Sequence, residues 1–137
     1  MLQELFDRGA IPMYEIPERI SPEAIMSSCE IVVGRPGGRG YGWFDAGIKP
    51  QGFFVGLIQD DLLTGVKSGF EHLWWVAPAH RGAASVALLS AFETDCKAEG
   101  CERISLGVSQ YIEVKRLVRF YRRRGYQEHG QIMSKRI

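Results

Sequence analysis

Apolar residues recur at helical spacing in two segments of the second half of the chain. In residues 83–99 the apolar positions with this spacing are Leu88, Leu89, Phe92 and Cys96. In the second segment they follow an i, i+3, i+4, i+7 pattern and are Val114, Leu117, Val118 and Tyr121. Both patterns are typical of amphipathic α-helices that bury one face. The sequence therefore predicts two helices, which end at Gly100 and Gly125.

Shorter apolar runs with strand character flank these helices. Phe53–Ile58 is one continuous run. Phe70–Val76 is rich in aromatic residues and is bounded by Gly69 and Pro78, and Arg103–Val108 alternates polar and apolar residues. The tail after Gly125 predicts two short strands around Gly130. From the first of these strands onward, the predicted order is strand, strand, helix, strand, helix, strand, strand. This order predicts an α/β (α+β) domain with a mixed sheet and helices packed on it.

The N-terminal part of the chain has a weaker pattern. Residues 1–8 are predicted to form a short helix, and a second helix is predicted to open at the N-cap Ser21, with Pro22 at its first position. Glu30–Val33 is rich in β-branched residues and predicts a strand. The segment Gly34–Gly42 is dense in glycine but lacks the Gly-Lys-Ser/Thr ending of a phosphate-binding loop. We therefore predict a flexible surface loop there, between two strands.

Composition and charge exclude several classes of protein. The 137 residues correspond to one domain, and the 17 basic and 16 acidic residues give a net charge of +1. This balance argues against a nucleic-acid coat protein and against an acidic disordered tail. There is no run of about 18 apolar residues, as a transmembrane helix would need, and the acidic N-terminus lacks the apolar core of a signal peptide. We expect a soluble, cytoplasmic domain with no membrane partner.

The cysteines and histidines show no pattern of a metal site or a disulfide framework. The three cysteines are odd in number and include no C-x-x-C pair. The three histidines lack the H-x3-H and HExxH spacings of metal sites. Neither metal binding nor disulfides are therefore predicted. Cys96 is interpreted as a core residue of its helix, with a reactive thiol as the alternative.

The junction between Val76 and the following helix is the strongest candidate for a binding site. The predicted strand ends at Val76 and the helix begins near Gly82, whose neighbours in the first turn are small: Ala83, Ala84 and Ser85. The leading amides of a helix lack intrahelical partners and carry the positive end of its dipole. Small side chains let a diphosphate approach these amides, and Arg81 can add charged hydrogen bonds. The alternative is a turn kept small for packing alone.

Two motifs in this half of the chain resemble those of a known superfamily. The first is V-x-P-x-x-R-G-x-A, formed here by Val76, Pro78, Arg81, Gly82 and Ala84. The second is Y-x-x-x-G-[FY], formed by Tyr121, Gly125 and Tyr126. Together with the order of strands and helices, they resemble the coenzyme A loop and the last helix of the GNAT superfamily of N-acetyltransferases. The resemblance covers about residues 53–137.

The resemblance implies a fold, an activity and a binding site. It implies a single domain over residues 1–137 with a mixed, mostly antiparallel central sheet flanked by helices. The strand that usually opens the family's domain at the N-terminus is missing in this chain or replaced by the glycine-rich loop. The implied activity is transfer of an acetyl group from acetyl-CoA to a primary amine of a small molecule or protein. The residues implied to bind the coenzyme are the Val76 backbone, Arg81, Gly82, Ala83, Ala84 and Ser85.

The same resemblance implies two catalytic residues. Glu71 matches the position of a glutamate base in many family members, and its alternative is a solvated carboxylate at a sheet edge. His72, on the opposite face of the strand, is a reserve base or a packed histidine. Tyr121 matches a tyrosine that sits near the thioester sulfur and would protonate the leaving thiolate. Its alternative is a packing role only.

Three departures from the family pattern define a rival prediction. The loop is R-G-A-A-S-V where the family usually has R-G-x-G-x-G, Val114 stands at the position of a common asparagine, and the opening strand is missing. The extra carbons at Ala84 and Val86 are expected to narrow the phosphate seat. Such variants resemble short GNAT-like proteins of tailed phages. The rival is therefore a catalytically inactive GNAT-fold protein with a structural or assembly role in a phage virion, with virion proteins or further copies of itself as partners.

The predicted last helix is strongly basic. Residues 115–124 carry one lysine and five arginines and no acidic residue. Such a helix could bind RNA or DNA phosphates, but no row of aromatic residues accompanies it beyond Phe120 and Tyr121. We favour the alternative, in which the helix presents a solvated face whose arginines balance acidic residues elsewhere.

Overall fold

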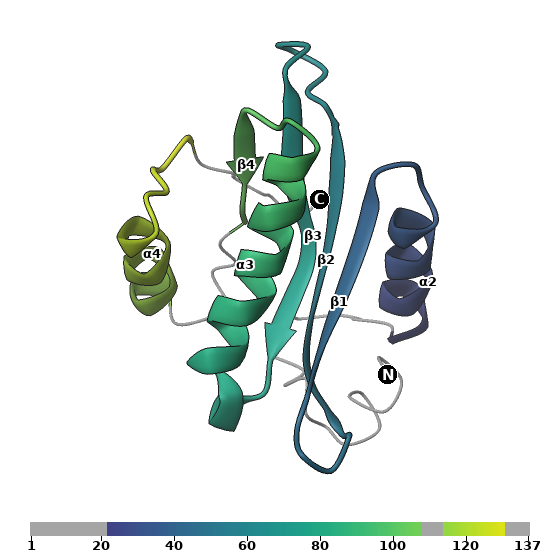
Figure 1. Cartoon of the computed structure of the whole chain (residues 1–137), viewed down its shortest axis with the longest axis vertical. Coiled ribbons are helices and arrows are strands. Elements are labelled where there is room, and N and C mark those ends of the chain that lie inside the picture. Colours follow the sequence, from purple (N-terminus) through teal and green to yellow (C-terminus); the bar gives the residue numbers. More distant parts are fainter. Residues whose placement is uncertain (1–21, 108–113, 131–137) are drawn as a thin grey trace, which may run out of the picture. The chain divides into compact units, whose positions relative to one another are not determined.

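The computed structural model describes residues 22–107 and 114–130, and Figure 1 shows their elements. In chain order these are α2 (Pro22–Val33), β1 (Gly38–Phe44), β2 (Pro50–Asp60), β3 (Lys67–Val76), the 3-10 helix η1 (Pro78–His80), α3 (Ala83–Ala98), β4 (Arg103–Ser105) and α4 (Val114–Arg123). The chain divides into two units, residues 1–106 and residues 107–137, and each is described by itself. A single domain over the whole chain stays a prediction.

The first unit contains a four-stranded sheet with the order β1-β2-β3-β4. β2 is antiparallel to both of its neighbours, β1 and β3, whereas β3 and β4 are parallel. β2 and β3 are longer than the predicted runs, and β4 is shorter because it ends at Ser105. The predicted fold class, an α+β fold with a mixed, mostly antiparallel sheet and flanking helices, is confirmed.

Neighbouring residues of β2 belong to two separate cores, because successive side chains of a strand point to opposite faces. Phe53 packs with Cys29 of α2 on one face. Phe54 packs on the other face against Phe92 of α3, with 4.8 Å between the ring centroids. Both phenylalanines are buried, with 1% and 0% of their surface exposed. α2 and α3 therefore cover opposite faces of the sheet (Figure 1).

The two predicted helices of the second half are confirmed. α3 buries the residues that its apolar period indicates: Leu88, Leu89, Phe92 and Cys96. It ends before Gly100, whose φ of 77° is a left-handed conformation that suits glycine. α4 buries Tyr121 and is followed by Gly125, which has a φ of 90°.

The predicted strand at Glu30–Val33 is wrong, because these residues form the last turn of α2. Their β-branched side chains favour a strand locally. However, Ile25, Cys29 and Val32 recur at spacings of a helix and pack together against the sheet. Burial of this helical face outweighs the local preference, and Ile31, outside the face, is 58% exposed.

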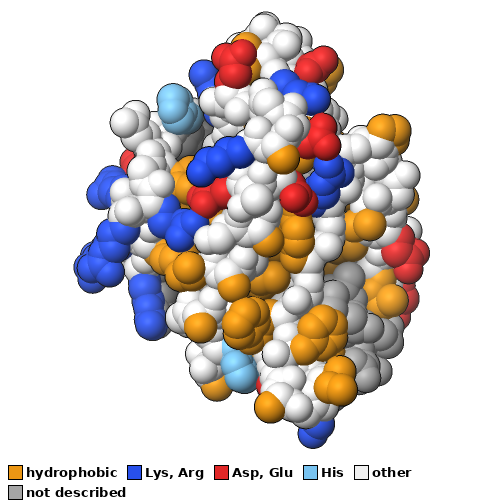
Figure 2. Space-filling view, in the orientation of Figure 1, with side chains coloured by type: hydrophobic (Ala, Val, Ile, Leu, Met, Phe, Trp, Pro, Cys, Tyr) orange, Lys and Arg blue, Asp and Glu red, His pale blue; other side chains and the backbone are white. Residues whose placement is uncertain are grey.

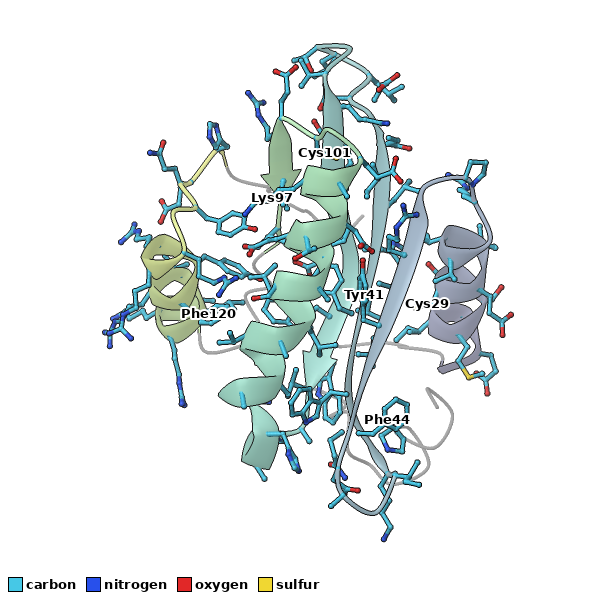
Figure 3. All side chains as sticks on the ribbon, in the orientation of Figure 1. Cys29, Tyr41, Phe44, Lys97, Cys101 and Phe120 are labelled. Atoms are coloured by element: carbon cyan, nitrogen blue, oxygen red, sulfur yellow. The ribbon has the colours of Figure 1, made fainter. Side chains whose placement is uncertain are left out.

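The predicted loop at Gly34–Gly42 is wrong over its second half, because β1 begins at Gly38. Glycine is depleted in strands, but here it lets β1 approach α2. A β-carbon added at Gly38 would lie 2.1 Å from the Val32 carbonyl oxygen. The larger side chains of β1 point the other way: Tyr41 reaches toward α3 (Figure 3). Its hydroxyl donates a hydrogen bond to Asp95.

The ends of the chain allow fewer comparisons. The helix over residues 1–8, the Ser21 cap and the opening strand all lie outside the described residues. Residues 126–130 are described and form no strand, so the first of the two predicted tail strands is wrong. The second strand falls on residues 131–137, which are also outside the described part.

Candidate active site

α3 begins without a side-chain cap. The chain passes from β3 through η1 and Arg81 to Gly82, the N-cap of α3. No side chain within the described residues caps this helix end. The first amides of an α-helix have no intrahelical partner, and the positive end of the helix dipole lies there. The N-terminus of this 16-residue helix therefore offers hydrogen-bond donors to an anion.

The space at this helix end is open. Gly82 and Ala83 are exposed, and a β-carbon added at Gly82 would meet nothing within 4 Å. Ser85 is half-buried. Ala84 differs, because the whole residue is buried, with 0% of its surface exposed. This burial argues against a methyl group that narrows the phosphate seat, whereas Val86 is 43% exposed. The expected narrowing at the two residues stays a prediction.

Arg81 is tied to the end of β3. Its Nε donates a hydrogen bond to the Val76 carbonyl oxygen at 3.2 Å. Among the described residues Arg81 makes no ion pair. The bond to Val76 holds the guanidinium next to the N-cap of α3, and its terminal nitrogens carry further donors. The sequence motif predicted Arg81 at this place but not its bond to the strand.

The edge of β3 beyond Phe70 is not covered by β4. Within the described residues, β4 pairs with β3 only from Ser68 to Phe70, although β3 continues to Val76. On this side, the backbone groups of residues 71–76 lie outside the ladder between β3 and β4. An extended ligand with amide groups can pair with such an edge as an added strand does. The open edge leads directly to the N-terminus of α3.

A β-bulge interrupts β3 next to the place where the pairing with β4 ends. Val55 of β2 pairs with Leu73, and Gly56 pairs with Glu71, which leaves His72 as the extra residue. A bulge bends its strand and re-aims side chains, and bulges are frequent beside active sites. The bulge therefore decides which way the polar side chains at this position point.

Glu71 and His72 lie on opposite faces of the sheet, as predicted. Glu71 pairs with Gly56, where an added β-carbon would lie 2.7 Å from the Phe92 ring of α3. Glu71 is therefore on the α3 side, and it is half-buried. His72 is exposed on the α2 side, where its Nε2 shares a 2.5 Å hydrogen bond with the Ser28 hydroxyl. Sequence reasoning missed this partner, which lies 44 residues away along the chain.

Tyr121 belongs to the second unit and is 6% exposed. Its hydroxyl donates a hydrogen bond to the Gly107 carbonyl oxygen at 3.3 Å. Its ring centroid lies 5.9 Å from that of Phe120 and 5.8 Å from that of Tyr126. The ring is therefore packed, while the hydroxyl keeps a polar partner. The catalytic role of Tyr121 stays a prediction.

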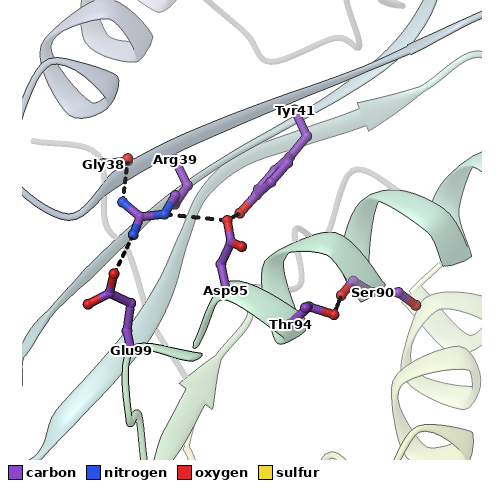
Figure 4. A network of polar contacts seen from close by, with 7 residues as sticks. All are labelled: Gly38, Arg39, Tyr41, Ser90, Thr94, Asp95 and Glu99. Atoms are coloured by element: carbon purple, nitrogen blue, oxygen red, sulfur yellow. Dashed lines mark hydrogen bonds and ion pairs between the residues drawn. The ribbon is translucent and has the colours of Figure 1, made fainter. Parts of the chain in front are cut away.

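A polar network on the α3 side of β1 was not predicted from the sequence (Figure 4). Arg39 forms ion pairs with Asp95 of α3 and with Glu99, the C-cap residue of α3, at N–O distances of 3.4 and 3.0 Å. Tyr41 donates a hydrogen bond to Asp95 at 2.5 Å. Burial, and then this hydrogen bond, raise the pKa of Tyr41 well above its ordinary value. The four side chains bind one another, so the network attaches α3 to β1.

The three cysteines are free thiols. Burial raises the pKa of Cys29, and the Glu30 carboxylate adds to the effect. Burial also raises the pKa of Cys96 to about 12, so neither group is a thiolate at neutral pH. Cys96 is 1% exposed and is confirmed as a core residue. Among the described residues, no three potential metal-ligating side chains come together.

The basic side chains of α4 gather on its surface, as the blue atoms over this helix in Figure 2 show. The exposed ones are Lys115, Arg116, Arg119, Arg122 and Arg123. Arg122 forms an ion pair with Glu128 at 2.6 Å. Arg124 lies over the Phe120 ring, 6.0 Å from its centroid. Arg122 and Arg124 thus have local partners. Nucleic-acid binding through α4 stays untested.

The first motif of the acetyltransferase resemblance lies at the β3–α3 junction, and the second lies in and directly after α4. The family model for the acetyltransferase (GNAT) family matches residues 3–126. This chain therefore belongs to the GNAT acetyltransferase family. The resemblance drawn from the two sequence motifs is confirmed at the level of the family. Among curated proteins, none matches this chain significantly.

Solved structures with the same fold span nearly the whole chain. A candidate acetyl transferase from Pyrococcus furiosus is 22% identical, with a TM-score of 0.76 and coverage of 99% of this chain and 93% of that one. An acetyltransferase from Trypanosoma brucei is 18% identical, with a TM-score of 0.69 and coverage of 100% and 95%. The aminoglycoside N-acetyltransferase AAC(6')-Iy in complex with CoA is 16% identical, with a TM-score of 0.71 and coverage of 99% and 86%. At these identities the likeness establishes the fold.

Other expectations find less support. The matches give no support to a phage origin or a virion location. No helix in the described ranges is long and apolar enough to cross a membrane. A cytoplasmic location stays a prediction.

Proposed function

We propose that this protein is an N-acetyltransferase that moves the acetyl group of acetyl-CoA to a primary amine. The observation that carries the proposal is the uncapped N-terminus of α3, with Arg81 fixed next to it at the end of the open β3 edge. In a member of the GNAT acetyltransferase family, this arrangement supports binding of a coenzyme diphosphate.

The residues of the β3–α3 junction fit the phosphate and amide groups of the coenzyme. The amides of the first turn, Ala83, Ala84 and Ser85, would hold the diphosphate. Gly82 lets it approach, since even a β-carbon there would meet nothing within 4 Å. Arg81 would add charge-assisted hydrogen bonds. The backbone of β3 up to Val76 would pair with the amides of the pantetheine arm.

Acetyl transfer from a thioester to an amine needs two proton movements. A base takes a proton from the acceptor ammonium, and an acid returns a proton to the leaving thiolate. The family resemblance assigns these roles to Glu71 and Tyr121. The Tyr121 hydroxyl, which donates to the Gly107 carbonyl, carries the proton that such an acid would give.

Single-turnover acetylation of a panel of primary amines, beside calorimetric titration with acetyl-CoA, tests the proposal. We expect binding heat, an acetylated amine and release of the free coenzyme A thiol. Tyr121→Phe keeps the packed ring and removes the hydroxyl, so turnover should fall on the order of a hundred-fold with acetyl-CoA affinity nearly unchanged. Absence of binding heat at millimolar acetyl-CoA would contradict the proposal.

A catalytically inactive GNAT-fold protein with a structural or assembly role is the second candidate. It is favoured by Val114 at the position of the common family asparagine and by the R-G-A-A-S-V loop. If it is correct, the wild type and Tyr121→Phe both fold and melt alike, and neither releases coenzyme A thiol with any amine.

A further inference from the structure

We propose that His72, held by Ser28, is the base that takes the proton from the acceptor amine, on the α2 side of the sheet. The inference rests on the proposed acetyltransferase function and assigns a catalytic residue to it. The family resemblance implies Glu71 for this role, whereas the packing on the two faces of β3 favours its neighbour.

On the α3 side of β3, core packing lies next to Glu71 at its cross-strand neighbour and at the preceding residue of the same face. A β-carbon added at Gly56, which pairs with Glu71, would lie 2.7 Å from the Phe92 ring. At Gly69, two residues earlier on the same face, an added β-carbon would lie 2.4 Å from the Cys96 sulfur. A face packed too closely for a methyl group also excludes an amine substrate. Glu71 therefore borders packed core on this face.

The α2 side is open at His72. His72 is exposed, whereas Glu71 is half-buried. The bulge places His72 and Leu73 on the same side of the strand, since Leu73 packs with the α2 core and His72 bonds to α2. The pairing with β4 ends at Phe70. A thioester arm along the uncovered edge would therefore pass His72, on a face that solvent and an acceptor can reach.

Ser28 orients the imidazole ring. Its hydroxyl lies 2.5 Å from Nε2 of His72. With the Nε2–H donated to the Ser28 oxygen, Nδ1 carries the lone pair that accepts a proton. Ser28 is half-buried, and its neighbour Cys29 anchors α2 on the sheet at 3% exposure. Ser28, on a packed helix, thus orients the base, as the residue that hydrogen-bonds to the catalytic base does in many active sites.

The proton count of the reaction balances with this assignment. Nδ1 of His72 takes one proton from the acceptor ammonium, and the neutral nitrogen attacks the thioester carbonyl carbon. The C–N bond forms and the C–S bond breaks. The acid of the proposed reaction gives its proton to the thiolate, and the second proton that the attacking nitrogen loses restores this acid. The imidazolium then releases its proton to water. The products are the N-acetyl amine, the coenzyme A thiol and one proton.

Substitutions in the full chain test the assignment by single-turnover acetyl transfer at saturating acetyl-CoA. His72→Gln should lower the rate by about a hundred- to ten-thousand-fold, with acetyl-CoA affinity unchanged by calorimetry. Ser28→Ala should lower the rate roughly five- to tenfold by loss of one orienting hydrogen bond, and Ser28→Thr should keep most of it. Added imidazole should restore part of the rate of His72→Gly, which a merely structural side chain would not show.

Two matched controls come from exposed residues outside the proposed site, Ser27→Ala and His129→Gln, and both should keep the wild-type rate. Thermal melts verify that every variant folds. A full rate in His72→Gln, or a His72→Gly rate that imidazole leaves unchanged, overturns the inference and leaves the acetyltransferase function standing. A wild type that binds no acetyl-CoA or acetylates no amine removes the proposed function, and the inference with it.

Discussion

The two halves of β3 differ in what covers them. From Lys67 to Phe70 the strand has partners in both β2 and β4, and α3 lies so close that a β-carbon does not fit at Gly69. From Glu71 to Val76 the described residues pair with β2 alone, and the strand carries a bulge. The first half is paired on both edges and packed against α3. Within the described residues the second half is paired with a strand on one edge, and it ends shortly before the N-terminus of α3. The candidate site therefore lies where the core ceases to cover the strand.

The largest expected effect is on the stability of the packed half. Phe92 is 0% exposed and lies against Phe54. Phe92→Ala should lower the free energy of unfolding by about 3–5 kcal/mol, because the lost transfer energy and the cavity add. Urea denaturation measures this change. Leu62→Ala, at a residue that is 95% exposed, is the control and should change stability by less than about 0.5 kcal/mol. Equal losses in the two variants would show that Phe92 does not close a core.

On the open half, the largest expected effect is on the affinity for acetyl-CoA. Arg81→Ala removes the guanidinium that the Val76 carbonyl holds beside α3. Affinity should fall about ten- to a hundred-fold, or about 1.5–3 kcal/mol, for the loss of a charged hydrogen bond. Calorimetric titration measures it, with the exposed Arg35→Ala as control. Unchanged affinity in Arg81→Ala would place the coenzyme elsewhere.

A matched pair of glycine substitutions compares the packed half of β3 with the N-cap of α3. Gly69→Ala puts a β-carbon 2.4 Å from the Cys96 sulfur, so the free energy of unfolding should fall by about 1–3 kcal/mol. At Gly82 the φ is −72° and an added β-carbon meets nothing within 4 Å. Gly82→Ala should therefore change stability by less than about 0.5 kcal/mol. Thermal melts measure both, and a larger loss at Gly82 would refute the difference in packing.

The smallest expected effect is at Ala84. Because its methyl group is buried, Ala84→Gly should cost about 1 kcal/mol of stability or less. Acetyl-CoA affinity should not change, since the methyl group points into the core. Melting and titration of the same preparation measure both quantities. Tighter binding would support the view that this methyl group narrows the phosphate seat.

Much of the second half of the fold could be predicted because local periodicity and burial coincide there. The helical spacing of Leu88 and Phe92 predicts α3, and both residues are buried in it. β1 could not be predicted in the same way. Its glycines disfavour a strand locally, and Gly38 finds its reason in the turn from α2 to β1, where the chain folds back within 2.1 Å of an added β-carbon. The apolar periodicity carries no signal of this close turn.

Some residues of the candidate site could be predicted from local sequence, and others could not. Arg81 and Gly82 could be predicted because the motif that contains them is contiguous and lies at the start of a strongly periodic helix. The pair of Ser28 and His72 could not, since it joins residues 44 apart through a bulge that leaves no pattern in the sequence. The burial of Ala84 could not be predicted either. Several small residues follow one another at the start of α3, and only the folded helix shows which of them faces the core.

The central claim is that the N-terminus of α3 and Arg81 bind acetyl-CoA, and thermal melting with and without acetyl-CoA tests it most directly. A ligand at about 100 times its Kd adds about 2.7 kcal/mol to the free energy of unfolding. We predict a clear rise in the Tm of the wild type and a smaller rise in Arg81→Ala at the same concentration. An unchanged Tm of the wild type at millimolar acetyl-CoA, or an equal rise in both proteins, would contradict the claim.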